Sequence, residues 1–269
     1  MPKAAVLGSP IAHSRSPLLH SAAYRMLGLN WTYERHDVDV ASFPAFLASH
    51  VGEFRGLSLT MPLKEIAHAT ATTLDAAARA TGAVNTLVFG DALAGYNTDV
   101  VGFVEALRAA GREPGEEACV LGTGATARSA AVALQQLGVR TLHVVGRRPE
   151  ALEQFGTWAT AIGIDTVAHA WDAPPLSLPV TISATVAGAT DARPVPTQPG
   201  LLFDAIYAPW PTPYAANWRD ARGSVIGGLS LLVQQAAEQV ILMTRVHPDN
   251  RIAIVRAMED ALRMAGNPA

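Results

Sequence analysis

The chain has 269 residues, of which 49% are hydrophobic and 16% are charged, and its formal net charge is −3 at pH 7. This composition predicts a globular chain long enough for two domains, and the slightly acidic balance argues against nucleic acid or an anionic membrane as a partner. The single cysteine, Cys119, excludes an internal disulfide framework and fits the reducing cytoplasm, where we expect the protein to act.

The sequence carries no readable signal for targeting or for metal binding. The N-terminal run MPKAAVLGSP has one lysine and an apolar stretch too short for a signal peptide. No uninterrupted run of about 18 apolar residues occurs, so we expect no membrane-spanning helix. The eight histidines form neither an H-E-x-x-H motif nor a pairing with cysteine, so no metal site is predicted.

The first hundred residues alternate short β-rich runs with amphipathic, alanine-rich segments. Strands are predicted at 3–8, 31–38 and 56–60. A helix is predicted at 16–29, with Ser16 as its N-cap and Pro17 at its first position. The segment 82–99 is typical of two strands around a Gly-Asp turn. This alternation predicts an α/β fold with a largely parallel sheet.

A second domain is predicted to follow the polar Pro/Gly break REPGEE at 112–117. Its predicted strands lie at 118–122, 141–148, 180–185, 201–207 and 224–228. A helix is predicted at 125–138, and two long helices follow at 229–246 and 250–265.

The stretch VLGTGATARSA at 120–130 is the most specific single motif. Gly122, Gly124 and Ala127 form G-x-G-x-x-A between a predicted strand and a predicted helix. Gly122 permits the tight turn, Gly124 lets a pyrophosphate approach the backbone, and Ala127 keeps the helix close to the sheet. The free N–H groups of the helix N-terminus, where Ala125 lies, would bind the phosphates. We predict a dinucleotide site here, the alternative being an ordinary glycine-rich turn.

The end of the next strand indicates which dinucleotide is bound. A site for NAD usually has an acidic residue there, which binds the ribose 2′-hydroxyl. This strand instead ends in VVGRRPE, with Arg147 and Arg148 at the tip. Two guanidinium groups can clamp a 2′-phosphate, so NADP is favoured. The alternative is a solvated helix start, in which Glu150 pairs with one of the arginines.

Four clusters in the first domain carry polar groups at strand or helix ends. Ser14 and Ser16 lie beside a helix N-terminus, where two hydroxyls suit a carboxylate. Thr60 and Lys64 follow the strand that ends in LSLT, Asn85 lies in GAVNT, and Asp99 lies in YNTD. Three of these clusters have a purely structural alternative: Ser16 and Asp99 as helix N-caps, and Lys64 as a solvated lysine at a helix start.

Six stretches together resemble the shikimate dehydrogenases in order and spacing, and they cover nearly the whole chain. They are SPIAHSRSP, GLSLTMPLK, GAVNTL, GYNTDVVGF, VLGTGATARSA and GGLSLLVQQA. The resemblance implies reduction of the ketone of 3-dehydroshikimate to shikimate with NADPH, on the pathway to chorismate and the aromatic amino acids. It also implies an N-terminal α/β substrate domain completed by the C-terminal helices, and a Rossmann-like NADP-binding domain. We therefore place the substrate domain at 1–101 plus 229–269 and the NADP-binding domain at 102–228.

The resemblance also implies roles for single residues. Lys64 and Asp99 would be the catalytic pair, because Lys64 could stabilise the charge that hydride addition builds on the ketone oxygen and supply its proton. The expected carboxylate-binding residues are Ser14 and Ser16, and the expected hydroxyl-binding residues are Thr60, Asn85, Asp99 and Gln235. Tyr207 would line the pocket, Thr185 would lie near the nicotinamide, and Gly228 completes the expected cofactor site.

Three positions depart from the family's common pattern. Ser58 and Ser183 stand where the family commonly has Asn, and Gly227 stands where it commonly has Asp. A quinate/shikimate dehydrogenase with relaxed substrate or NAD use is therefore an alternative. A methylene-tetrahydrofolate dehydrogenase fits the paired serines less well, and a catalytically silent NADP sensor would not need Lys64 beside Asp99. We expect a monomer or homodimer.

Overall fold

The computed structural model describes residues 1–50 and 52–266, and the chain divides into two compact units. Unit 1 comprises Met1–Gly102 and Leu232–Ala269, and unit 2 comprises Phe103–Leu231. The boundaries fall inside helices α5 (Thr98–Ala109) and α9 (Gly228–Thr244). Helix ends give the clearest sequence signals, so a boundary inside a helix is difficult to read from sequence.

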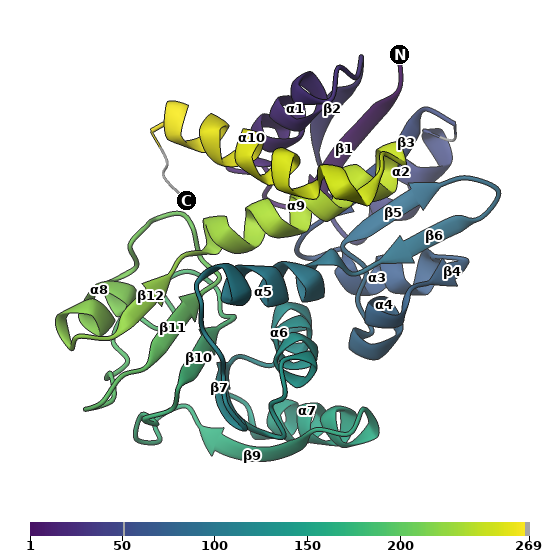
Figure 1. Cartoon of the computed structure of the whole chain (residues 1–269). Helices are drawn as coiled ribbons and strands as arrows, with labels where there is room; N and C mark the ends of the chain where they lie inside the picture. The colour runs from purple at the N-terminus through teal and green to yellow at the C-terminus, as the bar shows by residue number, and fades with distance from the viewer. Residues whose placement is uncertain (51, 267–269) are drawn as a thin grey trace. The chain divides into compact units, whose positions relative to one another are not determined.

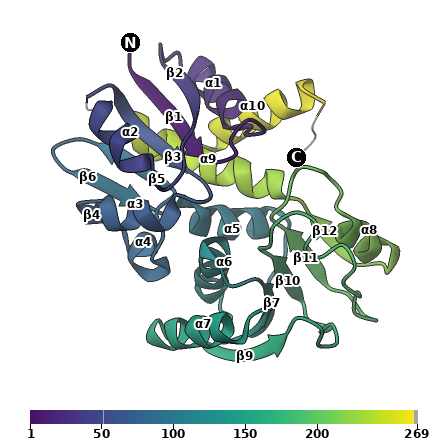
Figure 2. The same ribbon diagram turned by 180° about the vertical axis from the view of Figure 1, so that it is seen from behind.

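Unit 1 contains a six-stranded sheet with helices on both faces. Besides α5 and α9, which both units share, unit 1 contains β1 (Lys3–Gly8), α1 (Ser16–Met26), β2 (Thr32–Asp37), α2 (Phe43–Ser49), β3 (Phe54–Leu59), α3 (Lys64–Thr70), β4 (Thr73–Leu74), α4 (Ala76–Thr81), β5 (Thr86–Phe89), β6 (Leu93–Tyr96), the 3-10 helix η1 (Pro248–Asn250) and α10 (Arg251–Met264). The strand order is β2-β1-β3-β5-β6-β4. Helices α1 and α10 lie side by side (Figures 1 and 2).

The sheet of unit 1 is mixed. Strand β1 pairs in parallel with β2 and β3, and β4 pairs in parallel with β6. Strand β5 is antiparallel to both β3 and β6. The hairpin of β5 and β6 turns through residues 90–92, which include the predicted Gly-Asp signal, and a turn this short requires antiparallel pairing.

Successive side chains of a strand point to opposite faces of the sheet, and the two faces of the unit 1 sheet differ in character. One face carries Leu7, Leu57 and Leu87, which belong to a buried apolar cluster shared with residues of α2, α3 and α4. Ser58 and Thr86 are direct cross-strand neighbours one position along from these leucines, so they lie on the opposite face. Both are buried, at 3% and 0% exposure, so this face of the sheet has polar groups in its interior.

Helix α1 corrects one prediction about capping. Ser16 is not the N-cap: the helix begins at Ser16, its N-cap is Arg15, and that end has no side-chain capping bond. The helix also ends at Met26 rather than at 29. Gly28 adopts a left-handed conformation with φ +65°, and the N–H of Leu29 donates to the Tyr24 carbonyl oxygen, which closes the C-terminus early.

Unit 2 is a doubly wound parallel sheet. Its elements besides the shared helices are β7 (Glu117–Leu121), α6 (Ala125–Gln136), β8 (Thr141–Gly146), α7 (Pro149–Ala161), β9 (Asp165–Ala170), β10 (Val180–Ser183), β11 (Leu201–Asp204), α8 (Pro213–Asp220) and β12 (Ser224–Ile226). The strand order is β12-β11-β10-β7-β8-β9. From β7 the chain first adds β8 and β9 on one side, and then adds β10, β11 and β12 on the other side, so the order of the strands reverses between β7 and β10. Open α/β sheets bind ligands at the carboxyl ends of the strands beside such a reversal.

Helices cover the sheet of unit 2 as Figures 1 and 2 show, with α6 and α7 beside β7–β9 and α8 beside β11 and β12. Under α8, Trp218 and Tyr214 pack with Cys119 and Leu121 in a buried cluster. Burial raises the pKa of the Cys119 thiol to about 12, so this cysteine is an unreactive core residue. In the described parts of both units, no helix is both long enough and apolar enough to cross a membrane.

Candidate active site

Lys64 and Asp99 form a shielded ion pair in unit 1. Lys64 opens helix α3, just after the turn that follows β3, and Asp99 lies in the first turn of α5. The Lys64 Nζ lies 2.6 Å from Oδ2 of Asp99, and the two side chains are only 14% and 8% exposed. Solvent and salt screen such a pair less than a surface pair. Lys64 is therefore not a solvated lysine at a helix start.

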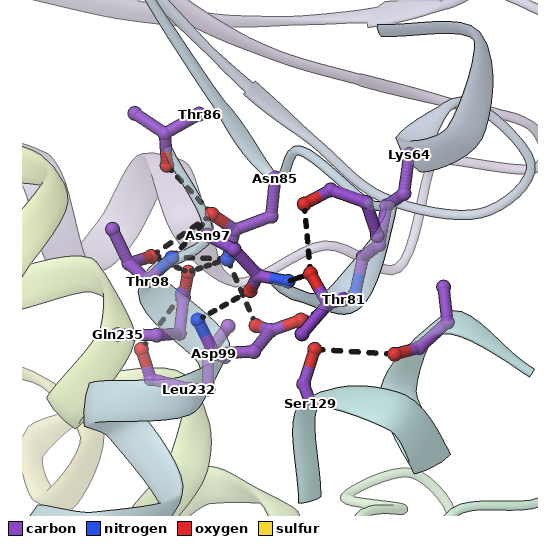
Figure 3. A network of polar contacts seen from close by, with 12 residues as sticks. Lys64, Thr81, Asn85, Thr86, Asn97, Thr98, Asp99, Ser129, Leu232 and Gln235 are labelled. Atoms are coloured by element: carbon purple, nitrogen blue, oxygen red, sulfur yellow. Dashed lines mark hydrogen bonds and ion pairs between the residues drawn. The ribbon is translucent and has the colours of Figure 1, made fainter. Parts of the chain in front are cut away.

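Asn85 holds the second oxygen of the Asp99 carboxylate. Its Nδ2 donates to Asp99 Oδ1 at 2.9 Å and to Thr98 Oγ1 at 3.0 Å. Its Oδ1 accepts from the Thr98 backbone N–H at 2.9 Å and from the Thr86 hydroxyl at 2.8 Å. Asn85 is only 2% exposed. The donors around Oδ1 and the acceptors around Nδ2 fix the orientation of the amide (Figure 3).

The start of α5 shows that Asp99 is not the N-cap of its helix. Asn97 precedes the helix, and its Oδ1 accepts from the Asp99 backbone N–H at 3.1 Å. The Asn97 Nδ2 donates to Thr81 Oγ1 at 2.8 Å, which anchors the cap to the end of α4. The Asp99 carboxylate is thus left for Lys64, at a helix end where a negative charge is favoured.

Gln235 reaches the same network from helix α9. Its Oε1 accepts from Asn85 Nδ2 and from the Thr98 hydroxyl, both at 3.4 Å, and its Nε2 donates to the Leu232 carbonyl oxygen at 3.0 Å. The side chain is 7% exposed. The structure thus joins four of the predicted site residues: Lys64, Asn85, Asp99 and Gln235 (Figure 3).

Ser14, Ser16 and Thr60 lie near the carboxyl ends of two neighbouring strands. Strands β1 and β3 are parallel, so the loop after β1 and the turn after β3 leave the same edge of the sheet. The Ser16 backbone N–H donates to Ser14 Oγ at 3.3 Å, which ties the two serines together. The Thr60 N–H donates to the Leu7 carbonyl oxygen at 3.0 Å, which fixes the start of the turn that leads to Lys64.

The G-x-G-x-x-A motif of unit 2 forms the turn between β7 and α6. Gly122 has φ +112°, and a Cβ there would lie 2.8 Å from the Ala184 carbonyl oxygen, so only glycine fits. Gly124 is the N-cap of α6, and a Cβ on it would meet nothing within 4 Å. Ala125 begins the helix, and Ala127 is fully buried where the helix meets the sheet. The turn has the geometry that a pyrophosphate needs.

Arg147 and Arg148 follow β8, and both are exposed. Among the described residues, neither forms an ion pair with Glu150. The Arg147 guanidinium instead lies 6.0 Å from the centre of the Trp171 ring, and that of Arg193 lies 5.2 Å from it. Trp171 directly follows β9, the strand next to β8, so the indole can hold Arg147 by a cation–π contact.

The remaining predicted cofactor residues also lie at strand ends of unit 2. Thr185 follows β10 and is partly buried. Gly228 begins α9; its N–H donates to the Ile206 carbonyl oxygen at 3.1 Å, and a Cβ there would collide with the Ala205 backbone. Tyr207 follows β11 in the same unit and is partly buried. Gly228 is therefore required for the close approach of two chain segments.

The three departures have different surroundings. At Gly227 a Cβ would lie 2.7 Å from the Trp210 ring, so an aspartate there would require the tryptophan to move. Ser183 is fully buried, and its Oγ lies 3.4 Å from Oγ1 of Thr185. Ser58 hydrogen-bonds to two other buried side chains, described below. Each departure is thus accommodated by its neighbours.

Sequence reasoning missed several residues of these networks. Asn97 and Thr98 precede Asp99 in YNTD, and a cluster of capping residue types before a helix could have identified them. Gln239 lies four positions after Gln235 on α9 and so falls on the same helix face. Trp171 carries no local signal, because its role depends on pairing of β8 with β9. No cluster of three or more potential metal ligands occurs within 1–50 and 52–266.

Comparison with known proteins identifies the same family over most of the chain. A family model described as the shikimate dehydrogenase substrate binding domain matches residues 6–87. The shikimate dehydrogenase (NADP(+)) of Methylobacterium radiotolerans is 40% identical over 253 residues, which cover 87% of this chain and 88% of that one.

Two solved structures are also similar. Shikimate dehydrogenase of Mycobacterium tuberculosis superposes with a TM-score of 0.85 at 40% identity, over 96% of this chain and 100% of that one. Shikimate 5-dehydrogenase of Thermus thermophilus, in complex with NADP(H) and shikimate, gives a TM-score of 0.84 at 33% identity, over 97% and 100%. On this sequence identity and coverage, the chain belongs to the shikimate dehydrogenase family.

Proposed function

We propose that this protein is an NADP-dependent shikimate dehydrogenase, which reversibly reduces 3-dehydroshikimate to shikimate with NADPH in chorismate and aromatic amino acid biosynthesis. The observation that carries the proposal is the shielded Lys64–Asp99 pair, 2.6 Å apart, in a chain of this family. Relatives named shikimate dehydrogenase (NADP(+)), and a solved relative in complex with NADP(H) and shikimate, support the substrate and the cofactor.

The proposed chemistry follows from the residues of unit 1. Hydride addition to the ketone builds negative charge on its oxygen, and that oxygen must then receive a proton. Lys64 can stabilise this charge and supply the proton, and in the reverse direction it accepts one. Asp99 and Asn85 hold the ammonium group in position through the bonds at 2.6 and 2.9 Å. The same groups can also bind a ring hydroxyl.

The other roles in the substrate domain are proposed from the position and chemistry of the side chains. We assign the substrate carboxylate to the linked hydroxyls Ser14 and Ser16. Ring hydroxyls are assigned to Thr60, Asn85, Asp99 and Gln235, and Tyr207 is assigned to the pocket wall. Ser16 is buried and is not the N-cap of α1.

We expect Ser14→Ala to lower kcat/KM for shikimate by about ten- to a hundred-fold, because a charge-assisted hydrogen bond contributes about 1.5–3 kcal/mol. The substitution also removes the bond from the Ser16 backbone N–H to Ser14 Oγ at 3.3 Å, so thermal unfolding of the variant should be compared with that of the parent. Steady-state kinetics with shikimate measure the effect. The control is a substrate analogue with a neutral amide in place of the carboxylate, on which variant and parent should differ much less. A variant as active as the parent on shikimate would show that Ser14 does not bind the carboxylate.

The proposed NADP site uses the strand ends of unit 2. The pyrophosphate is assigned to the turn of Gly122, Gly124, Ala125 and Ala127, beside the N-terminus of α6. Thr185 and Gly228 are assigned to the nicotinamide side. Arg147 and Arg148 are assigned to the 2′-phosphate, and Trp171 supports the first of them through its ring.

Replacing Arg147 and Arg148 with glutamine should raise KM for NADP strongly and leave KM for NAD nearly unchanged. Only NADP carries the 2′-phosphate, and each lost charge-assisted bond costs about 1.5–3 kcal/mol. Parallel kinetics with both cofactors at saturating shikimate give the ratio. Equal efficiency of the parent protein with NAD and NADP would contradict the assignment, as would an equal loss with both cofactors in the variant.

Absorbance at the NADPH band, with shikimate and NADP supplied, tests the function directly. Formation of NADPH supports it, and quinate and NAD in parallel assays test the relaxed alternative. Binding of NADP without turnover of either acid would indicate a sensor and would contradict the proposal. We place the protein in the cytoplasm as a monomer or homodimer, which fractionation and light scattering would check.

A further inference from the structure

A continuous path of buried hydrogen bonds runs from Tyr33 in β2 to the carboxylate of Asp99. Its middle members are Ser58 in β3, Gln239 in α9, Thr86 in β5 and Asn85. No member of the path is more than 8% exposed. All of them belong to unit 1, and Ser58 and Thr86 are cross-strand neighbours on the inner polar face of the sheet. The proposed function assigns no role to Tyr33, Ser58, Gln239 or Thr86.

The donors in this path all point the same way. The Tyr33 phenol donates to Ser58 Oγ at 2.6 Å, and the Ser58 hydroxyl donates to Gln239 Oε1 at 2.7 Å. The Gln239 Nε2 donates to Thr86 Oγ1 at 3.0 Å, and the Thr86 hydroxyl donates to Asn85 Oδ1 at 2.8 Å. Thr86 accepts from Gln239, and its single proton goes to Asn85 Oδ1, which can only accept.

Gln239 has only one possible amide orientation in this environment. Its Oε1 accepts from Ser58 and also faces Nε2 of His20 at 3.3 Å, while its Nε2 donates to Thr86 and to the Asn85 carbonyl oxygen at 3.3 Å. Burial lowers the pKa of His20 to about 3, so its ring is neutral and carries a single N–H. The Asn85 carbonyl oxygen can only accept, which assigns the amide nitrogen of Gln239 to that side. A flipped amide would face donors with its N–H groups and acceptors with its oxygen.

We propose that Gln239 is a positioning residue for the dehydrogenase reaction, which acts through Thr86 to fix the Asn85 amide against the Asp99 carboxylate. This inference rests on the proposed function. Asn85 must present its Nδ2 to Asp99, because a flipped amide would place an oxygen against the carboxylate. The bonds from the Thr98 backbone N–H and the Thr86 hydroxyl to Oδ1 oppose that flip together, and Gln239 orients the Thr86 hydroxyl in the second of them.

Gln239→Glu tests the direction of the donors. The glutamine and glutamate side chains have the same shape. An ionised carboxylate cannot donate to Thr86, whereas the neutral acid can donate one hydrogen bond. Burial raises the pKa of a carboxyl group, so the variant should titrate within an accessible range. We expect the ratio of variant to parent kcat to fall about tenfold from about pH 6 to about pH 9, the equivalent of one net hydrogen bond. KM for shikimate should change much less.

The neighbouring ionisable groups must be considered in reading that profile. They are His20 and Tyr24 of α1, Tyr33 of β2, Lys64 of α3, Asp99 of α5, Glu238 of α9 and Arg251 of α10. All of them are also present in the parent protein, so taking the ratio of the two profiles removes their shared contribution.

Gln234→Glu is the matched control, because it makes the same change five positions earlier on α9, where Gln234 accepts a bond from Arg251. This control should keep the parent profile.

Two further variants test the positioning role without relying on Gln239→Glu. Gln239→Met cannot donate at any pH, so its kcat should be about tenfold low across the whole range. Thr86→Val removes the next link, and combining it with Gln239→Met should add little further loss, because both act through one bond. Thermal unfolding identifies any variant that does not fold.

The outcomes separate this inference from the proposed function. A parent protein that does not oxidise shikimate contradicts the function. An active parent contradicts the positioning role if Gln239→Glu follows its pH profile, if Gln239→Met or Thr86→Val keeps its kcat, or if the losses appear only in KM. A pH-dependent loss of kcat in Gln239→Glu, absent from Gln234→Glu, supports the role. If Gln239→Glu does not fold, the kcat values of Gln239→Met, Thr86→Val and their double variant test the positioning role instead.

Discussion

Lys64→Ala is expected to lower kcat for shikimate oxidation by about 10²–10⁴-fold, which is the range for loss of a general acid–base group. This corresponds to about 3–5 kcal/mol of barrier. The dissociation constant for shikimate should change much less, because the other proposed contacts to the carboxylate and ring hydroxyls remain. Single-turnover kinetics and equilibrium binding separate the two effects.

The chain supplies its own control for this substitution. Of its 20 Lys and Arg residues, only Lys3 and Lys64 are lysines. Lys3 lies on the surface, where its Nζ is 2.9 Å from Glu53 and its side chain is 36% exposed. Lys3→Ala should keep the parent kcat, because an exposed surface pair contributes little to stability and nothing to the reaction. A Lys64→Ala protein that keeps most of its kcat would remove Lys64 from the mechanism.

Lys64→Arg distinguishes the charge from the proton. A guanidinium group is always protonated in proteins, so it can stabilise an oxyanion but cannot exchange a proton with it. If proton transfer is the main contribution, the arginine variant should be nearly as slow as the alanine variant. A large recovery of kcat in Lys64→Arg would show that the charge alone is sufficient.

Hydrophobic periodicity predicted several long, regular elements of the fold, but it missed α7 (Pro149–Ala161) and α8 (Pro213–Asp220). Strand β1 has the predicted bounds, 3–8, and helix α10 (Arg251–Met264) lies within the predicted 250–265. Shorter helices were not predicted: α2, α3 and α4 have six or seven residues, too few for a helical period to stand out. Strand β9 was also missed, because most of its residues are exposed at the edge of the sheet and its sequence, DTVAHA, lacks a strong apolar run.

The candidate site was predictable to the extent that its chemistry is local in sequence. The glycine turn at 122–127 and the YNTD segment are short motifs, and the structure gives them the expected turn and helix start. The bonds that position the side chains join distant residues: Asn85 and Gln235 are 150 positions apart, and Ser58 and Gln239 are 181 apart. Such pairs depend on how α9 returns to the first unit of the chain, which local patterns do not specify.

Asp99→Asn should lower kcat by about 10²–10³-fold, or about 3–4 kcal/mol of barrier, because it leaves the partly buried Lys64 ammonium without its opposite charge. The side chain keeps its shape, but an amide cannot accept from both Lys64 and Asn85. Whichever way it turns, its N–H₂ group faces a donor, either the Lys64 ammonium or the Asn85 Nδ2. Stopped-flow measurement of NADPH formation at saturating shikimate would give the loss.

The double variant Lys64→Ala, Asp99→Asn tests whether the two residues act as one unit. Groups that act together give losses that do not add, so the double variant should be about as slow as Lys64→Ala alone. Full additivity would mean that Asp99 contributes independently of the ammonium, for example by binding a ring hydroxyl. The shikimate dissociation constant of Asp99→Asn decides between these readings. A value near the parent's supports positioning of Lys64, whereas a weakening that matches the loss in kcat/KM would assign Asp99 to substrate binding.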